Sequence, residues 1–286
     1  MTDATGAIDS PIAVAQALAQ ARALGLDRLD AQLLLSGLLG QSRSWLLAHD
    51  DAALSAEQAA RWADWLARRA DGEPVAYLLG ERGFHGLTLA VSPAVLDPRP
   101  DTETLVDWAL DVLAGQPTGA RVLDLGTGSG AIALAIRQAR PDAQVSAVDL
   151  SEAALAVARG NGARLGLPVR WLQGAWLAPV AGETFDLIVS NPPYIAEGDE
   201  HLPALKHEPA LALTSGPDGL DAIRHLVAHA GLQLPPGGWL LLEHGHDQAD
   251  AVAALLRQQP GWAGIAHRRD LGGHRRCTGA RRTSPA

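Results

Sequence analysis

The chain has 286 residues but only one cysteine, Cys277, and it lacks any long apolar run. A single cysteine excludes an intramolecular disulfide and a metal site built from several thiolates, so we expect Cys277 to be a small buried apolar residue. No apolar run reaches the length of a membrane-spanning helix, and the first residues lack the basic-then-apolar pattern of a secretion signal. These absences favour a cytoplasmic protein without membrane contacts.

Positive charge is also scarce, because 23 lysines and arginines stand against 32 aspartates and glutamates, for a net charge of −9. Such a balance argues against extended, nonspecific contact with a nucleic-acid backbone. The charge is uneven: from Trp262 onward six arginines accompany one acid, Asp270, which gives this segment +5 and leaves −14 for residues 1–261. We interpret the segment as a basic last strand rather than a nucleic-acid-binding patch.

Residues 1–73 predict a compact helical domain that carries no candidate catalytic residue. Its strongest signal is the capping-box sequence Ser55–Gln58, which opens a helix running to about Ala70. Substrate docking and simple stabilisation are both consistent with such a domain. The expected helices are Ile12–Leu24 after a start at Ser10-Pro11, Asp30–Leu39 ended by Gly40, Ser44–His49, and the helix after Ser55, whose Trp62, Trp65 and Leu66 share one apolar face.

Residues 74–97 predict a β-hairpin linker. Asp71–Pro74 is a turn signal, and the segments Tyr77–Gly86 and Leu87–Val91 are expected to supply the two strands. The hairpin would connect the helical domain to the rest of the chain.

Residues 98–286 are expected to form the second domain. Pro98-Arg99-Pro100 holds the chain extended before a helix at Thr104–Leu113. Asp101 and Glu103 fall in the first turn of that helix, where the helix dipole favours acids. Helix capping is therefore their simplest explanation.

The middle of the chain alternates strands and helices in the manner of a doubly wound nucleotide-binding sheet. Arg121–Leu125 is a buried strand, and the glycine-rich loop Gly126–Gly130 joins it directly to a helix, Ala131–Arg140. A second strand, Val145–Asp149, ends in an acid, which completes the first half of a Rossmann-like α/β domain. The later elements are a helix at Glu152–Gly160 capped by Ser151, strands at Val169–Leu172, Phe185–Ser190 and Gly238–Glu243, helices at Gly219–Gly231 and His246–Gln258, and a terminal strand pair near 262–278.

The glycine-rich loop lets backbone N–H groups approach a ligand at a helix N-terminus. Its spacing alone also fits the dinucleotide fingerprint, so the neighbouring acids have to identify the ligand. Asp124, two residues before the loop, favours a cationic or amino-bearing ligand over a pyrophosphate, although a bond within the loop also explains it. Asp149 is placed to accept from both hydroxyls of a ribose. Ribose, α-amino group and sulfonium charge together describe S-adenosylmethionine.

The stretch Asn191-Pro192-Pro193-Tyr194 follows a buried, β-branched strand at 185–190. Two prolines cannot continue a sheet, because neither donates a backbone hydrogen bond, and they hold Asn191 and Pro192 out of the helical region. The stretch is therefore expected to be a stiff turn at the carboxyl end of a strand, where open α/β sheets bind ligands. A rigid strand exit without a ligand is the alternative interpretation.

With these features together, the chain resembles the glutamine N5-methyltransferases that modify peptide-chain release factors, the HemK/PrmC family. The resemblance runs from about residue 10 to 280, and the order and spacing of its motifs are specific. The motifs are Pro98–Glu103, Asp124–Gly130, Val148–Leu155, Asn191–Tyr194, Glu208-Pro209 with Asp218–Leu220, Glu243–Gln248 and Arg269–Gly273.

This resemblance implies methyl transfer from S-adenosylmethionine to the side-chain nitrogen of the glutamine in the Gly-Gly-Gln motif of a class 1 release factor, leaving S-adenosylhomocysteine. It implies a monomer whose partner is the release factor, without direct nucleic-acid contact. Members often carry an acid before the adenine-side tryptophan, where this chain has Ala175, so adenine contacts there would come from backbone N–H groups. The implied contacts to the methyl donor are Asp124, Gly126, Thr127, Gly128, Ser129 and Gly130, with Asp149 at the ribose, Trp176 at the adenine and Asn191 beside both donor and acceptor.

The expected catalytic residues follow from the chemistry of a carboxamide, whose nitrogen is a poor nucleophile. The side-chain oxygen of Asn191 and the carbonyl of Pro192 can each accept one N–H from the acceptor, which would turn the nitrogen lone pair toward the methyl group. Pro193 and Tyr194 would complete the acceptor site, where the tyrosine ring face attracts the developing positive charge. No general base is evident.

Three other functions fit parts of the sequence. Adenine-N6 and guanine-N2 methyltransferases use a similar Asn/Asp-Pro-Pro-aromatic loop, but they need a basic channel that a charge of −14 over residues 1–261 disfavours. An NAD-dependent oxidoreductase fits the glycine-rich loop but not Asn191–Tyr194, and a noncatalytic protein would bind the methyl donor without transfer. His244 and His246 lack a third metal ligand nearby, so we expect structural hydrogen bonds there and no metal.

Overall fold

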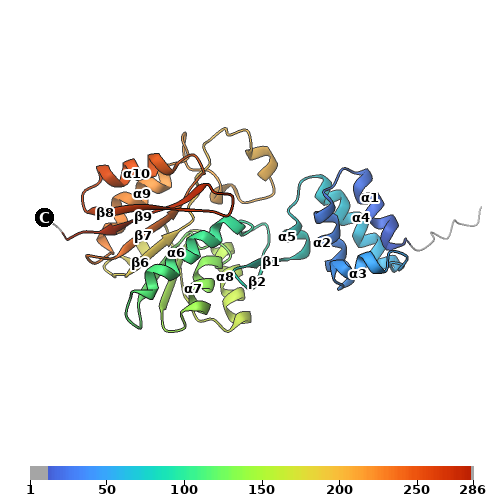
Figure 1. Ribbon diagram of the computed structural model, residues 1–286, viewed down its shortest axis with the longest axis horizontal. Helices are drawn as coiled ribbons and strands as arrows, with labels where there is room; N and C mark the ends of the chain where they lie inside the picture. Colours follow the sequence, from blue (N-terminus) through green and yellow to red (C-terminus); the bar gives the residue numbers. More distant parts are fainter. Residues whose placement is uncertain (1–11, 285–286) are drawn as a thin grey trace, which may run out of the picture. The chain divides into compact units, whose positions relative to one another are not determined.

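The computed structural model describes residues 12–284 and divides the chain into two compact units, one ending at Gly80 and one beginning at Glu81 (Figure 1). The division falls inside the segment 74–97 that the sequence predicts as a linker. Each unit buries an apolar core of its own. Within the described residues, no helix is both long and apolar enough to cross a membrane.

Helices alone form the described part of the N-terminal unit, as the sequence predicts. Ser55 accepts from the backbone N–H of Gln58 at 3.1 Å, and the Gln58 side chain accepts from the Ser55 N–H at 2.8 Å, which confirms the capping box. Trp62, Trp65 and Leu66 are buried, which confirms the apolar face of that helix. The helices are α1 (Val14–Ala23), α2 (Arg28–Leu39), α3 (Arg43–Ala48), α4 (Ala56–Ala70) and α5 (Val75–Leu79).

The second and third helices begin at capping residues that the sequence analysis did not use. The predicted start at Ser10-Pro11 lies outside the described residues. Asp27 caps α2 by accepting from the backbone N–H two residues later at 2.7 Å, and Ser42 caps α3 by accepting three residues later at 3.1 Å. Gly40 ends α2 in the left-handed conformation (φ 63°), as predicted.

The segment before the hairpin differs from the prediction. The sequence analysis began a strand at Tyr77, whereas Val75–Leu79 forms the helix α5, which follows Pro74 and ends at a left-handed Gly80. The three central residues of α5 are all buried, and a run buried on every side lacks the alternation of a half-exposed strand. The antiparallel hairpin is correspondingly short, with β1 at Glu81–Phe84 and β2 at Leu87–Ala90.

The hairpin is tied to the glycine-rich loop by one buried side chain. Asn161 accepts from the backbone N–H of Ala90 at 2.7 Å and donates to the carbonyls of Ala90 and Ser129, both at 3.0 Å. The side chain therefore uses its oxygen and its nitrogen to join two segments that are distant in sequence.

Glu103 lies in the first turn of α6, as predicted, and Asp101 lies in the 3-10 turn before it, but neither side chain makes a capping hydrogen bond. Glu103 instead accepts from the backbone N–H of His85 in the hairpin turn at 2.9 Å. Asp101 forms an ion pair of 3.1 Å with Arg276 near the end of the chain. Both acids join segments of the second unit, a role that local helix patterns cannot reveal.

The second unit is built on a seven-stranded sheet in the order β5-β4-β3-β6-β7-β9-β8 (Figure 1). Neighbouring strands are parallel except β9, which is antiparallel to both β7 and β8. The chain reverses its direction of travel across the sheet at β3 and β6, where doubly wound sheets open a crevice. The strands are β3 (Arg121–Leu125), β4 (Gln144–Asp149), β5 (Arg170–Gln173), β6 (Leu187–Ser190), β7 (Trp239–Glu243), β8 (Trp262–Arg269) and β9 (Arg275–Arg282).

Helices cover both faces of this sheet, which confirms the predicted Rossmann-like architecture (Figure 1). One core cluster joins the sheet to α6 and α7, and the other joins it to α9 and α10. Helix α8 continues past Gly160, the predicted end, to a left-handed Gly166. The helices are α6 (Glu103–Ala114) after a 3-10 turn at Pro100–Thr102, α7 (Ala131–Ala139), α8 (Glu152–Leu165), α9 (Asp221–His229) and α10 (Ala249–Gln258), with further 3-10 turns at Ala178–Val180, Leu202–Leu205, Ala210–Ala212 and Ala230–Leu232.

The basic terminal strands carry their charge in local contacts. Several of the six arginines pair with acids of the same unit, and these pairs connect the strands to α6, to α10 and to the turn between β8 and β9. The interpretation as a basic last strand accounts for them without a nucleic-acid partner. The pairs are Arg268 with Asp111 at 2.8 Å, Arg275 with Asp250 at 2.7 Å and Arg276 with Asp270 at 3.1 Å.

Candidate active site

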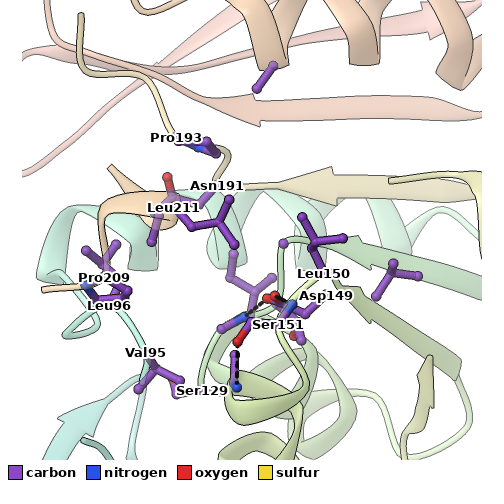
Figure 2. A pocket seen from close by; sticks show the side chains of 18 of the residues that line it. Val95, Leu96, Ser129, Asp149, Leu150, Ser151, Asn191, Pro193, Pro209 and Leu211 are labelled. Atoms are coloured by element: carbon purple, nitrogen blue, oxygen red, sulfur yellow. Dashed lines mark hydrogen bonds between the residues drawn. The ribbon is translucent and has the colours of Figure 1, made fainter. Parts of the chain in front are cut away.

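A cavity of about 530 Å³ opens at the carboxyl ends of β3, β4 and β6 (Figure 2). Its volume lies in the range of small-molecule sites. Figure 2 shows Ser129, Asp149 and Asn191, which follow or end three neighbouring strands, around this cavity. Among the predicted site residues, Gly126, Thr127, Gly128, Ser129, Asp149, Trp176, Asn191 and Pro193 line the cavity, whereas Asp124, Gly130, Pro192 and Tyr194 lie outside its lining.

The glycine-rich loop is fastened to the neighbouring strand. The N–H groups of Gly126 and Thr127 both donate to the Val148 carbonyl, at 2.9 and 3.1 Å. Gly126 has a φ of 72°, a left-handed conformation that glycine adopts without strain. A Cβ at Gly130 would lie 3.0 Å from the Trp171 ring and 3.1 Å from the Leu134 side chain, so close packing at the start of α7 favours glycine here.

Asp149 is held at the edge of the cavity by two backbone donors. Its Oδ2 accepts from the N–H of Gly128 at 2.8 Å, and its Oδ1 accepts from the N–H of Ser151 at 2.9 Å. A carboxylate has about four acceptor positions, so two remain for ligand hydroxyls. The geometry therefore agrees with the predicted contact to a ribose, and it adds a second role in fixing the loop.

Asp124 lies behind the cavity wall. Its side chain is fully buried and accepts from the Thr127 hydroxyl at 2.6 Å, while its Oδ1 has no hydrogen-bond partner. Burial raises the pKa of Asp124 to about 7, although the Thr127 hydrogen bond opposes this. A cation in the cavity would favour the ionised form, so the residue both braces the loop and attracts positive charge.

Trp176 lines the cavity from a strained backbone position. Its φ of 48° is unusual for a residue other than glycine, and such strain concentrates at functional sites. Its ring centroid lies 6.3 Å from that of His225 in α9, a cavity residue that the sequence analysis missed. Burial and the neighbouring His229 lower the pKa of His225, which favours the neutral ring beside the tryptophan.

Asn191 enters the cavity from the end of β6, as predicted. Its Nδ2 donates to the hydroxyl of Thr102 at 3.2 Å. Thr102 also lines the cavity and is almost completely buried, yet no local pattern had singled it out. Pro193 reaches the cavity wall, whereas Pro192 is buried and can offer only its backbone carbonyl.

Tyr194 lies beside the cavity rather than in its wall. Its hydroxyl donates to Glu243 over a long contact of 3.4 Å, and its ring packs on the core cluster beneath α9 and α10. Burial and the Glu243 charge raise the pKa of Tyr194, so the hydroxyl stays protonated. Tyr194 therefore contributes a hydrogen bond to the interior, and its predicted cover over the acceptor stays a prediction.

Arg99 and Glu208 form an ion pair at the cavity that the sequence analysis did not anticipate. Arg99 lines the cavity, while Glu208 is nearly buried and also accepts from the backbone N–H of Asp97 at 3.3 Å. The pair joins the Pro98–Pro100 segment to the long loop after Tyr194. Because 109 residues separate the two partners, no local pattern could have shown it.

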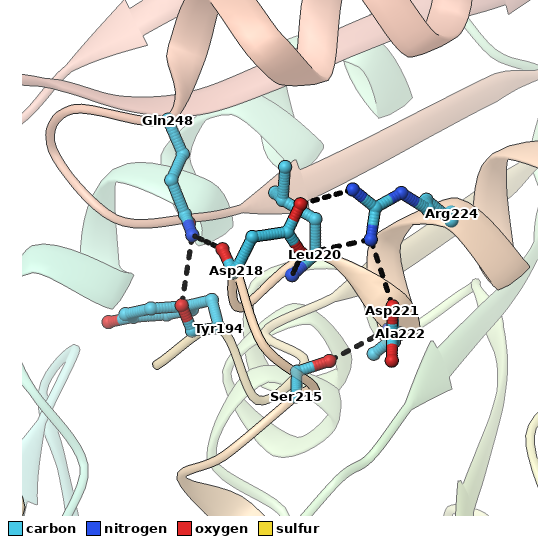
Figure 3. Close-up of polar contacts among 8 residues, drawn as sticks. All are labelled: Tyr194, Ser215, Asp218, Leu220, Asp221, Ala222, Arg224 and Gln248. Atoms are coloured by element: carbon cyan, nitrogen blue, oxygen red, sulfur yellow. Dashed lines mark hydrogen bonds and ion pairs between the residues drawn. The ribbon is translucent and has the colours of Figure 1, made fainter. Parts of the chain in front are cut away.

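The side chain of Gln248 contacts the turn that follows β6 (Figure 3). Its Nε2 donates to the carbonyl of Tyr194 at 3.0 Å and to that of Asp218 at 3.4 Å. Its Oε1 accepts from the N–H of Gly245 at 2.8 Å. This one side chain therefore connects the loops that follow β6 and β7.

Replacing Gly219 by alanine should disturb this junction. Gly219 has a φ of 75°, and an added Cβ would overlap the Tyr194 carbonyl and lie 2.9 Å from the Gln248 Nε2. The left-handed conformation alone costs alanine about 1–2 kcal/mol. We expect a lower free energy of unfolding in urea and a slower methyl transfer, because the Tyr194 carbonyl must move.

Gly198→Ala is the matched control, since Gly198 has a φ of 81° and no atom within 4 Å of an added Cβ. It should show the conformational cost but keep the transfer rate. Equal losses of transfer in both variants would contradict the role given to the junction.

The remaining candidates have structural roles. His244 is buried, and its ring nitrogens contact the Gly245 carbonyl and the Thr278 hydroxyl at 2.8 and 2.6 Å, which confirms structural hydrogen bonding for this histidine. His246 is exposed instead, and its ring centroid lies 5.6 Å from that of His274. Burial lowers the pKa of His244 to about 4. Cys277 is fully buried, as predicted. Within residues 12–284, no group of histidines, cysteines and acids is arranged to hold a metal ion.

The residues around the cavity fit S-adenosylmethionine. The buried Oδ1 of Asp124 lacks a hydrogen-bond partner, which suits a cationic ligand nearby. A Cβ at Gly126 would lie 3.8 Å from the Trp176 ring and 4.0 Å from the Asn191 carbonyl, so glycine keeps open the space between them. Asp149 has acceptor positions left for ribose hydroxyls. Asp149 and Asp124 thus suit the ribose and the positive charge of the methyl donor.

The sequence matches two protein families. Residues 12–80 match the PrmC N-terminal domain, and residues 102–208 match the methyltransferase small domain. A release factor glutamine methyltransferase from Bordetella pertussis is 52% identical over 258 residues, which cover 89% of this chain and 95% of that protein. The protein of the same name from Salmonella typhimurium is 44% identical over 271 residues, which cover 94% and 97%.

Solved structures show the same fold. A methyltransferase from Pyrococcus furiosus is 20% identical, with a TM-score of 0.54, and the match covers 78% of this chain and 100% of that one. The 16S rRNA N2 G1207 methyltransferase of T. thermophilus, in complex with AdoMet and guanosine, is 22% identical with a TM-score of 0.54, covering 71% and 49%. Both likenesses establish the architecture of the second unit.

Proposed function

Because the chain belongs to the family of release factor glutamine methyltransferases, we propose that it methylates the glutamine of the Gly-Gly-Gln motif in class 1 peptide-chain release factors. The methyl donor is S-adenosylmethionine, and the reaction takes place on the side-chain nitrogen, N5. The observation that carries the proposal is the position of Asn191, whose amide lines the cavity for the methyl donor at the end of β6.

The chain's task is to position a weak nucleophile. S-adenosylmethionine, when bound, supplies a methyl group that its positive sulfur already activates. The Asn191 oxygen and the Pro192 carbonyl accept the two N–H groups of the glutamine amide, which leaves the nitrogen lone pair free. Since Pro192 has no N–H and Asn191 is held by Thr102, the acceptors are fixed before the substrate arrives.

Other residues serve the methyl donor. Asp149 binds the ribose, and the backbone of Gly126, Thr127 and Gly128 surrounds the amino-acid part, with Asp124 supplying negative charge from behind. Trp176 takes the adenine side, where Ala175 also lines the cavity but offers no acid. We expect the missing acid to be replaced there by backbone N–H groups.

The proposal also covers the protein partner, the oligomeric state and the location of the enzyme. We infer a monomeric cytoplasmic enzyme that meets release factors through its N-terminal unit, with no direct nucleic-acid contact. The exposed side chains of Leu24, Leu29 and Leu47 offer apolar contacts on that unit. The pairing of Arg268, Arg275 and Arg276 with acids supports a protein substrate over nucleic acid.

The proposal is tested by tritiated methyl transfer from S-adenosylmethionine to a purified release factor. The control substrate is the same factor with the Gly-Gly-Gln glutamine replaced by alanine. We expect label on the native factor alone. Equal label on both would place the acceptor elsewhere, and label on RNA or DNA in its place would favour an exocyclic amine of a base.

A further inference from the structure

We propose that Thr102 and Glu243 are positioning residues that hold the Asn191 amide with its oxygen toward the acceptor and its nitrogen away from it. This inference rests on the proposed function, because it concerns the amide group of the substrate glutamine. The three residues lie before α6, at the end of β7 and after β6, so the fold alone brings them together.

The direction of the Asn191 amide decides what its side chain can recognise. An asparagine has one acceptor oxygen and one donor NH2, and the two groups have nearly the same shape. A glutamine NH2 requires an acceptor at this position, whereas a flipped Asn191 would present its own NH2 to it. The Nδ2 of Asn191 donates to the Thr102 hydroxyl at 3.2 Å, so the oxygen is left for the substrate.

Thr102 can fix the direction of the Asn191 amide only if the proton of its own hydroxyl points away from Asn191. A hydroxyl has one proton and two lone pairs, and it could equally donate to the Asn191 oxygen. The Glu243 carboxylate lies near this hydroxyl, which lowers the pKa of Glu243. An ionised carboxylate can only accept hydrogen bonds, so the Thr102 O–H points toward Glu243. The lone pairs of the threonine oxygen are then left for the Asn191 NH2 group.

The carboxylate of Glu243 lies in the interior of the second unit. It is fully buried, its Oε1 accepts from the Tyr194 hydroxyl at 3.4 Å, and its Oε2 is buried with no hydrogen-bond partner among the described residues. Burial raises the pKa of Glu243 to about 7, while Thr102, Arg276 and Tyr194 lower it and Asp101 raises it. At pH 8.5 the carboxylate is therefore ionised, and both hydroxyls point toward it.

The direction of the Asn191 amide should let the site distinguish a substrate glutamine from a glutamate. A substrate glutamate presents only acceptors, which the Asn191 oxygen repels, whereas a flipped Asn191 would donate to it. The relay from Glu243 through Thr102 should therefore reject a Gly-Gly-Glu peptide. Removing the Thr102 hydroxyl frees the amide to turn and should reduce this discrimination.

The test compares full-length wild type with Thr102→Val, Thr102→Ser and Glu243→Gln at pH 8.5 and saturating methyl donor. A Gly-Gly-Gln peptide serves as substrate and the matching Gly-Gly-Glu peptide as competitive inhibitor. The exposed Thr88 in β2 provides the control Thr88→Val. Affinity for S-adenosylhomocysteine and the urea midpoint are measured for each variant, to separate positioning from folding.

We expect Thr102→Val to reduce the transfer rate about tenfold or more and to narrow the preference for glutamine over glutamate by a similar factor. Thr102→Ser should restore the preference, Glu243→Gln should narrow it, and Thr88→Val should match wild type. An unchanged preference in Thr102→Val, or no rescue by serine, would overturn the inference. Absence of any transfer by wild type would instead overturn the proposed function.

Discussion

Replacing Asn191 by alanine should reduce the single-turnover rate of methyl transfer about 100-fold or more while leaving the affinity for S-adenosylmethionine within a few-fold. The rate falls because the glutamine amide loses an acceptor that is fixed beside the cavity. The affinity is largely kept because Asp149 and the glycine-rich loop are held by separate hydrogen bonds. Rapid-quench measurement with saturating methyl donor gives the rate, and calorimetry gives the affinity.

Two further measurements make this result specific. The urea midpoint of Asn191→Ala should stay close to wild type, since the only side-chain partner that Asn191 loses is the hydroxyl of Thr102. A variant that transfers methyl groups at a near-normal rate would remove Asn191 from the mechanism. A variant that loses affinity for the methyl donor as strongly as it loses rate would make Asn191 a residue of the donor site.

Replacing Asp149 by alanine should have the opposite signature, a rise of about 100-fold in the dissociation constant for S-adenosylmethionine. The change removes the acceptors for the ribose hydroxyls, and hydrogen bonds to charged groups are each worth about 1.5–3 kcal/mol. It also frees the backbone N–H groups of Gly128 and Ser151, so the loop loses its support. Calorimetric titration with the methyl donor and with S-adenosylhomocysteine measures the effect.

Asp186 supplies the control for this variant. Its Oδ2 accepts from the backbone N–H of Arg121 at 2.7 Å, at the opposite end of the strands from the cavity. Asp186→Ala removes a comparable structural hydrogen bond and should lower stability without weakening the affinity. If Asp149→Ala binds the methyl donor as tightly as Asp186→Ala does, the ribose assignment is wrong.

The sheet and the methyl-donor side of the site could be predicted because their signals are local. The loop Gly126–Gly130 lies directly between a buried strand and a helix, so its conformation and its place at the sheet edge follow from a short stretch of sequence. The capping box at Ser55 and the proline pair after β6 are equally local. Each sets backbone geometry through residues within about four positions of one another.

Predictions failed where burial or a distant partner decides the structure. Val75–Leu79 became a helix because its apolar run is buried in the N-terminal unit, and no alternation indicated a strand. Glu103 turned toward the hairpin, because a partner 18 residues away was available. The contact of Tyr194 with Glu243, 49 residues away, was likewise not evident from local sequence. Tertiary contacts of this kind override local preference.

The acceptor side of the site illustrates the same limit. Asn191 was identified from its proline neighbours, but the hydroxyl that orients it belongs to Thr102, 89 residues earlier. Glu243 stood out only as part of a family motif, and its role depends on complete burial beside that hydroxyl. Sequence reasoning therefore found the asparagine that binds the substrate amide but not the residues that give its side chain a direction.

The central claim is that this site methylates a carboxamide nitrogen, and the chemical form of the transferred methyl group tests it most directly. Release factor is labelled with tritiated methyl groups by the full-length enzyme and then hydrolysed in strong acid. An N-methylated glutamine side chain should release its label as methylamine, which becomes volatile once the hydrolysate is made alkaline. Label that is released as methanol, or that stays on a nonvolatile amino acid, would contradict the account.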